Sequence, residues 1–231
     1  DSLSLLGGAH KGFTAPSNSP NVDEETAINY ELGFRYQNGS LSTELIGFMS
    51  DYDNILGECT SSSGSDCTIG DAFNGDAATV AGLELLVSAN LARSSSYRIP
   101  VSLSYTLIDG EFDTDIADTD FFGSVSKGDP LPYLPENQFL ASVGFEKNNW
   151  AAYLSGNYVD EVCVRASCGD FEKTDNTFTV DISENYQFSS ALNFYARVEN
   201  LTSEEDILGR QPYGARPNKD RTVTAGLRFN F

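Results

Sequence analysis

The feature that most constrains the fold is a regular alternation of polar and apolar residues that recurs along the chain. Segments such as 30–36, 83–91, 101–107, 139–145 and 192–198 place an apolar residue at every second position. This period is typical of antiparallel β-strands with two different faces. About ten such strands are predicted, and no segment predicts an amphipathic helix of useful length. In two segments, 41–52 and 150–159, apolar residues occupy both registers, so their facing stays open.

The connections between these strands are short and long in strict alternation. Four are short (37–40, 92–97, 146–149 and 187–190), and five are long (about 8–26, 53–78, 109–136, 160–176 and 202–221). The pair Asn38-Gly39 predicts a type I′ hairpin turn. Tight turns at one rim and long loops at the other are typical of outer-membrane barrels. We therefore predict an all-β fold, an antiparallel transmembrane β-barrel; a soluble β-protein with solvated polar faces is the alternative.

Composition narrows the classes further. The formal net charge of −20 argues against nucleic-acid binding, which needs a basic face. No run of 18 apolar residues is present, so the sequence predicts no transmembrane helix. The 15 Phe, 11 Tyr and 1 Trp fit either aromatic girdles at membrane interfaces or a β-rich core.

The four cysteines fall into two local pairs, Cys59 with Cys67 and Cys163 with Cys168, and both pairs lie in long connections. Local pairs predict two disulfides and an oxidising compartment. Zinc is the alternative, but His10 is the only histidine and the spacings do not match short zinc knuckles.

Several blocks of the sequence resemble TonB-dependent outer-membrane receptors, in order and along the whole chain. The blocks are "GGAHKGFTAP", "EETAINYELGFRY", "ELIGFMSDYDNILGECTSSSGSDCTIGDAFNG", "VAGLEL", "GDPLPYLPENQF", "YARVENLTSEEDI" and "GRQPYGARPNKDRTVTAGLRFNF". They are most similar to the ferric dicitrate type. The cysteine-containing block, the "GARP" loop and the final phenylalanine carry most of the resemblance.

The resemblance implies a barrel of about 22 strands with a plugged lumen. Residues 1–231 would be about ten C-terminal strands of it, without the plug and the earlier strands. It implies active import of a ferric siderophore, ferric citrate first among them, through a bacterial outer membrane that the protein crosses many times. The expected partners are the TonB-ExbB-ExbD complex, acting on the missing N-terminal part, the ferric siderophore, membrane lipid and the barrel assembly machinery. Phe229 and Phe231 would then form the assembly signal at the C-terminus.

Candidate ligand residues lie at or near the long connections. Arg210 and Arg216 could bind an anionic iron chelate through their planar guanidinium groups, or could pair with the many acidic residues of the loops. His10 and Lys11, expected at the start of the first long loop, could face the ligand or have a structural role. Tyr133 and Gln138 could line the vestibule or shape a proline-rich loop.

Other functions find less support in the sequence. A single histidine and no nucleophile elbow argue against an enzyme, so we expect no catalytic residue. The acid-rich run 109–120 lacks the glycine and glutamate of an EF-hand, and we expect a solvated loop, no bound metal and no covalent cofactor. A passive porin or a small standalone outer-membrane barrel remains the alternative to active transport.

Overall fold

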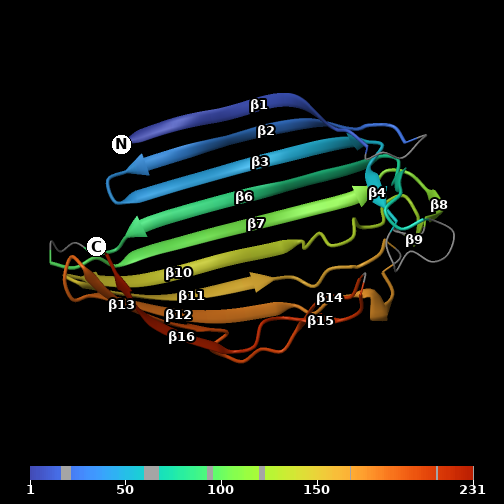
Figure 1. Ribbon diagram of the computed structural model, residues 1–231. Helices are drawn as coiled ribbons and strands as arrows, with labels where there is room; N and C mark the ends of the chain where they lie inside the picture. The colour runs from blue at the N-terminus through green and yellow to red at the C-terminus, as the bar shows by residue number, and fades with distance from the viewer. Residues whose placement is uncertain are drawn as a thin grey trace.

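The computed structural model describes residues 1–16, 22–59, 68–92, 96–119, 123–166, 168–211 and 213–230. Its main feature is one antiparallel sheet of ten strands (Figure 1), so the predicted fold class is confirmed. In order across the sheet the strands are β1 (Ser2–Thr14), β2 (Glu25–Asn38), β3 (Leu41–Asp53), β6 (Ala78–Asn90), β7 (Pro100–Phe112), β10 (Asn137–Lys147), β11 (Trp150–Val159), β12 (Thr177–Gln187), β13 (Leu192–Glu199) and β16 (Thr222–Phe229).

The described parts of the long connections lie at one end of the sheet, and all but the first connection carry small elements of their own (Figure 1). These are the pairs β4 (Leu56–Glu58) with β5 (Ala72–Asn74), β8 (Ile116–Thr119) with β9 (Gly123–Val125), and β14 (Ile207–Gly209) with β15 (Arg216–Pro217), together with the 3-10 helix η1 (Asp170–Glu172). We call this end the long-loop rim and the opposite end the short-turn rim. The described residues form no helix that is long and apolar enough to cross a membrane.

Two local predictions were wrong. Strand β1 continues to Thr14, so His10 and Lys11 lie in the strand and not at the start of a loop; β1 pairs with β2 along its whole length despite its glycines. In the first hairpin Asn38 pairs with Leu41, which makes Gly39 and Ser40 the central turn residues. Only Gly39 has a positive φ, of 51°, as in a type II′ turn rather than the type I′ turn expected.

The register divides the sheet into an apolar and a polar face, because successive residues of a strand point to opposite sides. One row of neighbours on the apolar face is Leu5, Phe34, Leu45, Leu85, Tyr105, Phe139 and Tyr158. Leu5 is 82% exposed and Leu32 on the same face is 74% exposed. The polar face carries the cross-strand ion pairs Arg35–Glu44 and Arg197–Asp181.

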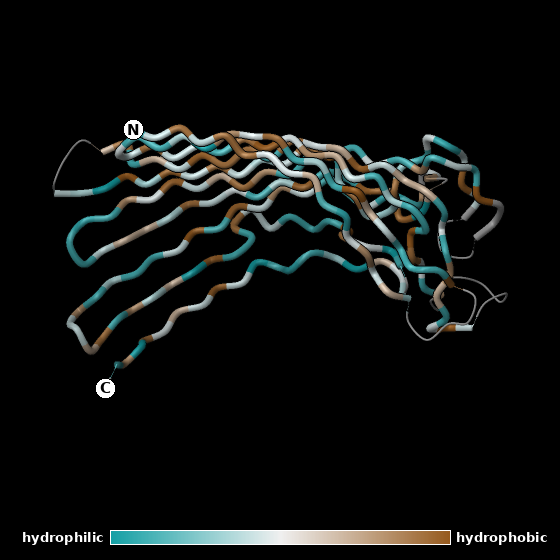
Figure 2. The backbone as a smooth tube through the Cα atoms, turned by 90° about the horizontal axis from the view of Figure 1, so that it is seen from above, coloured by the Kyte–Doolittle hydropathy of each residue, from teal (hydrophilic) through white to brown (hydrophobic). Residues whose placement is uncertain are grey.

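The sheet is curved into an open trough (Figure 2), and we assign the polar face to its inside. Side chains are crowded on this face: a Cβ at Gly82 would lie 2.6 Å from the ring of Phe48, and one at Gly144 would lie 2.5 Å from the ring of Tyr153. The ring of Phe48 thus needs the space that Gly82 leaves free. Phe48 of β3 and Tyr153 of β11 therefore lie on the polar face, which the sequence of these two strands had left open.

Aromatic residues gather at both ends of β10, β11 and β12 on the apolar face. Near the long-loop rim the rings of Phe139 and Tyr158 stack with their centroids 5.2 Å apart. Near the short-turn rim Phe145 lies 5.5 Å from Trp150. Tyr158 and Trp150 lie on the same strand, separated by about 27 Å at the usual rise per residue. Two aromatic belts around an apolar band match the lipid-facing surface of a transmembrane barrel.

Strands β1 and β16 form the two edges of the sheet, which does not close on itself. Both β1 and the last paired residue of β16 reach the short-turn rim, where Ser2 pairs with Gln37 and Phe229 with Leu192. Phe229 is 57% exposed on the apolar face. Phe231, the other residue of the expected assembly signal, lies outside the described residues.

Candidate functional site

The long-loop rim contains a small apolar core that fixes the loops to the sheet. Ala78 at the start of β6 and Phe112 at the end of β7 are paired across the two strands and are fully buried. They pack with Val125 from one long loop and Ala166 from the next, and with partly buried residues including Phe73 and Leu131. Since these residues come from three different loops, the core holds the loops over the polar face of the sheet.

The first two long loops are joined by hydrogen bonds around Asn74. The backbone N–H of Asp23 donates to Asn74 Oδ1 at 2.8 Å, and Asn74 Nδ2 donates back to the carbonyl of Asp23 at 3.0 Å. The backbone N–H of Leu56 donates to the carboxylate of Glu25 at 2.9 Å. These bonds connect Asp23 and the first residue of β2 with the hairpin of β4 and β5.

The last three long loops meet at Tyr133. Its backbone N–H donates to the carbonyl of Cys163 at 2.8 Å. Its hydroxyl oxygen accepts from the backbone N–H of Gln211 at 2.9 Å and lies 3.4 Å from the backbone nitrogen of Arg210. Tyr133 has a positive φ of 59°, a strained conformation for a bulky residue that the surrounding bonds maintain. One residue therefore fixes the relative positions of three loops.

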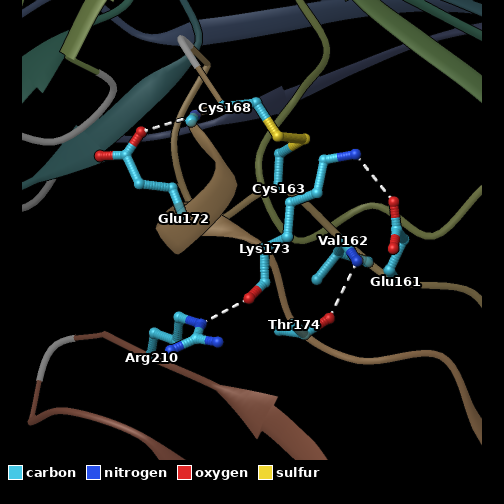
Figure 3. The surroundings of a disulfide bond; sticks show 9 residues. Glu161, Val162, Cys163, Cys168, Glu172, Lys173, Thr174 and Arg210 are labelled. Carbon is cyan, nitrogen blue, oxygen red and sulfur yellow. Dashed lines mark hydrogen bonds and ion pairs between the residues drawn. A yellow bond between two sulfur atoms is a disulfide. The ribbon is translucent and has the colours of Figure 1, made fainter.

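The disulfide between Cys163 and Cys168, the pair expected from the sequence, closes the middle of these three loops (Figure 3). The same loop presents the carbonyl of Lys173, which accepts a hydrogen bond from Arg210 Nε. The Lys173 ammonium pairs with Glu161 at 2.7 Å, and Val162 N–H donates to Thr174 Oγ1 at 2.9 Å. Cys59 is also disulfide-bonded, while Cys67, its expected partner, lies outside the described residues.

Arg210 and Arg216 each use part of their guanidinium group to hold the last loop. Arg210 is half-buried and binds Lys173; Arg216 is exposed and donates from Nη2 to the carbonyl of Gln211 at 2.9 Å. Within the described part of the chain neither makes an ion pair with an acidic residue. The expected pairing with loop acids is therefore not what the described residues show, and the remaining N–H groups can bind an anion.

Tyr133 is thus brought together with Arg210, but His10, Lys11 and Gln138 are not brought together with these arginines. His10 and Lys11 point to opposite faces of β1, and only His10 is on the polar face. There it lines a hollow of about 250 Å³ with Ser50, Glu31 and Glu84, and the carboxylates of the two glutamates favour cations over anions. Gln138 lies on the polar face of β10, where it pairs with Thr106. No group of three metal-binding side chains occurs among the residues that the structure describes.

Asp160, directly after β11, connects the rim to the sheet. Its carboxylate accepts from the backbone N–H and the side-chain amide of Asn137, at 2.9 and 2.7 Å, and from the hydroxyl of Tyr158. Burial alone raises the pKa of the Asp160 carboxyl, but these hydrogen bonds outweigh it and the pKa lies below its ordinary value of 3.8. The sequence does not single out Asp160, because its role depends on Asn137, which is 23 residues away.

We expect the bonds around Asp160 to loosen in acid. A carboxyl whose pKa is lowered by folding stabilises the folded state at pH values above its pKa in the unfolded chain. This stabilisation is lost as the pH falls through the lowered pKa of the folded state, which lies below 3.8. Hydrogen exchange at the Asn137 amide should therefore accelerate there beyond its intrinsic pH dependence. In Asp160→Asn that extra pH dependence should be absent; an unchanged profile in the variant would contradict the assignment.

Replacing Tyr133 with phenylalanine should loosen the junction of the last three loops without unfolding the sheet. The change removes the acceptor for Gln211 N–H, a net loss of about 1 kcal/mol. Hydrogen exchange at the Gln211 and Arg210 amides should become about fivefold faster, by the same conversion. Tyr213→Phe is the matched control, since that ring is 84% exposed; equal effects of the two changes would argue against the junction.

Asn200 is a rim residue that the sequence reading missed. It is buried, has a positive φ of 51°, and donates from Nδ2 to the carbonyls of Glu204 and Lys219, both at 2.9 Å. Its Oδ1 accepts from Glu204 N–H at 2.9 Å. Asparagine directly after a strand, followed by Leu-Thr-Ser, is a turn signal that could have identified it.

Comparisons with known proteins agree with this architecture. The chain has a TM-score of 0.76 and 17% identity to the copper transporter OprC, and 0.76 and 20% to the ferric citrate transporter FecA in its unliganded form. For the siderophore receptor PiuA from Acinetobacter baumannii the values are 0.75 and 14%. Each likeness covers at least 98% of this chain but only 38, 36 and 34% of the respective structure. No curated protein matches the sequence.

A family model identifies the relationship at the level of sequence. The model described as "TonB dependent receptor-like, beta-barrel" matches residues 1–201, which is most of the chain. The solved structures support the same fold and show that the chain spans little more than a third of such a protein. The chain therefore belongs to the TonB-dependent receptor-like β-barrel family, a family of outer-membrane proteins.

Proposed function

We propose that this chain is the C-terminal barrel portion of an outer-membrane receptor that imports a ferric siderophore, energised through the TonB-ExbB-ExbD complex. The observation that carries the proposal is the family match over residues 1–201. The names of the structural neighbours, which include a ferric citrate transporter and a siderophore receptor, support the ligand class. On this proposal β1 and β16 pair with earlier strands of a barrel of about 22 strands, and the chain functions only as part of it.

The two faces of the sheet support a location in the membrane. An apolar outer face with two aromatic belts suits lipid, and a polar inner face suits a wet or protein-filled lumen. Unpaired strand edges are not tolerated in lipid, so the edges of β1 and β16 need partners. The proposal includes assembly by the barrel machinery with Phe229 and Phe231 as its signal.

Ferric citrate is the first ligand to test, because the free N–H groups of Arg210 and Arg216 are suited to carboxylates. The test is uptake of radiolabelled ferric citrate by cells that carry or lack the full-length gene. Uptake should require the gene and an energised membrane. Uptake that persists without energisation would favour the passive porin, and accumulation of a different chelate would correct the ligand.

A matched pair of substitutions tests the arginines directly. In the full-length protein, Arg216→Ala should raise the Kd for ferric citrate about tenfold, because a charge-assisted hydrogen bond to a carboxylate is lost. Arg98→Ala makes the same change in charge at the short-turn rim, where Arg98 pairs with Glu146 at 2.8 Å, and should leave the Kd unchanged. Equal effects would point to a general influence of net charge.

A further inference from the structure

One row across the polar face consists almost entirely of serines. Following the register from β1 to β11, the neighbours are Ser2, Gln37, Ser42, Ser88, Ser102, Ser142 and Ser155. We call these residues the serine row. Rows above and below it are mixed: the next row toward the long-loop rim contains Arg35, Glu44 and Leu86 between serines.

The side chains of the serine row are open to the trough and have no partner among the described residues. Ser2, Ser88 and Ser102 are exposed, and Ser42, Ser142 and Ser155 are half-exposed. Within the described part of the chain none of the six hydroxyls makes a hydrogen bond. Two hollows, of about 850 and 320 Å³, lie over the row and share Ser42 and Ser88. The hydroxyls are therefore available to water or to a ligand.

The serine row runs obliquely from one rim toward the other. Ser2 begins β1 at the short-turn rim, whereas Ser155 lies halfway along β11. Because barrel strands are tilted, a row perpendicular to the strands climbs the wall as it passes around it. The row therefore connects the short-turn rim with the middle of the wall.

A set of paired charges continues the row toward the long-loop rim. Ser155 is the neighbour of Asp181 on β12, which binds Arg197 at 3.0 Å. Arg197 lies 3.3 Å from Glu199, and Glu199 binds Lys219 in the last long loop at 2.7 Å. The two acidic and two basic groups cancel each other. A polar surface without net charge thus extends from Lys219 to Ser2.

We propose that the serine row and these paired charges form the wall along which a hydrophilic ligand rich in carboxylate and hydroxyl oxygens moves from the long-loop rim to the short-turn rim. Serine hydroxyls donate and accept hydrogen bonds without holding an anion by charge. Passage requires sites that bind well enough to admit a solute and weakly enough to release it. Neutral hydroxyls on successive strands meet both needs. This inference rests on the proposed import function and specifies the surface used.

The test compares apolar substitutions on and off the row in the full-length protein. The double variant Ser88→Leu/Ser102→Leu should slow energised ferric citrate uptake about tenfold, since two hydrogen-bonding groups are lost to the passing ligand. Equilibrium binding to non-energised cells should not change. The variant Asn185→Leu is the control: Asn185 lies on the same face but away from the serine row and the paired charges, between Ala151 and Tyr195 on its neighbouring strands. The variant Ser88→Thr/Ser102→Thr, which keeps both hydroxyls, should transport normally.

Cysteine labelling shows whether the wall is wet. In outer membranes, Ser88→Cys and Ser102→Cys should react with a small charged methanethiosulfonate reagent, and ferric citrate should slow the reaction during energised uptake. Unreactive cysteines would mean that protein packs on the row and would overturn the proposal. Normal uptake by the double leucine variant, or equal loss in Asn185→Leu, would also overturn it. A wild-type protein that imports no ferric chelate would instead remove the proposed function on which the inference depends.

Discussion

Phe112→Ala is expected to release the long loops from the sheet, at a cost of about 3–5 kcal/mol. Phe112 is fully buried between residues of three loops. Removing its ring therefore leaves a cavity, which the paired ends of β6 and β7 cannot fill. The backbone of Phe112 also binds the long loop between β7 and β10. Its carbonyl accepts from Gly128 N–H at 2.8 Å, and its N–H donates to the carbonyl of Asp129 at 3.0 Å. Hydrogen exchange at Gly128 and Leu131 should show the release most clearly.

Phe171→Ala is the matched control for this prediction. It removes the same side chain from the same rim, but Phe171 is 89% exposed. We expect a change within about 0.5 kcal/mol, as for surface substitutions elsewhere. Urea unfolding of the full-length protein in lipid vesicles measures both variants. Similar costs for Phe112 and Phe171 would show that the loops are not held by the buried core.

The second large effect is expected from placing a charge on the apolar face. Leu103→Arg should destabilise the protein in a bilayer by about 2–4 kcal/mol, because an arginine near the midplane must be removed from water. Leu103 lies on the apolar face of β7, between Val87 and Ala141 on its neighbouring strands and between the two aromatic belts. The cost should fall in detergent, where water and charged headgroups can reach the side chain more easily.

A polar-face residue of the same strand provides the control. Thr106 points to the polar face, where its neighbours are Glu84 and Gln138. Thr106→Arg should change the free energy of unfolding by no more than about 1 kcal/mol, since an arginine beside Glu84 forms an exposed ion pair. Two residues of one strand thus give opposite outcomes for the same new side chain. A larger cost at Thr106 than at Leu103 would mean that the faces are assigned the wrong way round.

Alternation was sufficient to predict most of the ten strands, because most of them have one apolar and one polar face. It failed at β1, where the glycines in "GGAHKGFT" resemble a loop although the backbone pairs fully with β2. The sequence also did not predict which residues of β3 lie on which face. Phe48 is an apolar residue on the polar face, and its ring occupies the space that Gly82 leaves free in a neighbouring strand. Such packing is determined by residues far apart in the sequence.

The rim shows the same limit for the candidate site. Tyr133 and Arg210 were singled out as residues that could meet a ligand, but their bonds to Cys163, Gln211 and Lys173 join loops whose contacts no local pattern reveals. The ligand role of the arginines stays a prediction. The sequence did locate the loop disulfide of Cys163, because close cysteine spacing is itself local information.

The central claim is that the apolar face of the sheet meets lipid and the polar face lines the lumen. Spin labels placed one at a time along residues 101–107 of β7, in the full-length protein in lipid vesicles, test it directly. Accessibility to oxygen, which enriches in lipid, should peak at Val101, Leu103, Tyr105 and Leu107, and accessibility to a water-soluble nickel chelate should peak at Ser102, Ser104 and Thr106. Accessibility to both reagents without alternation, or alternation in the opposite phase, would contradict the account.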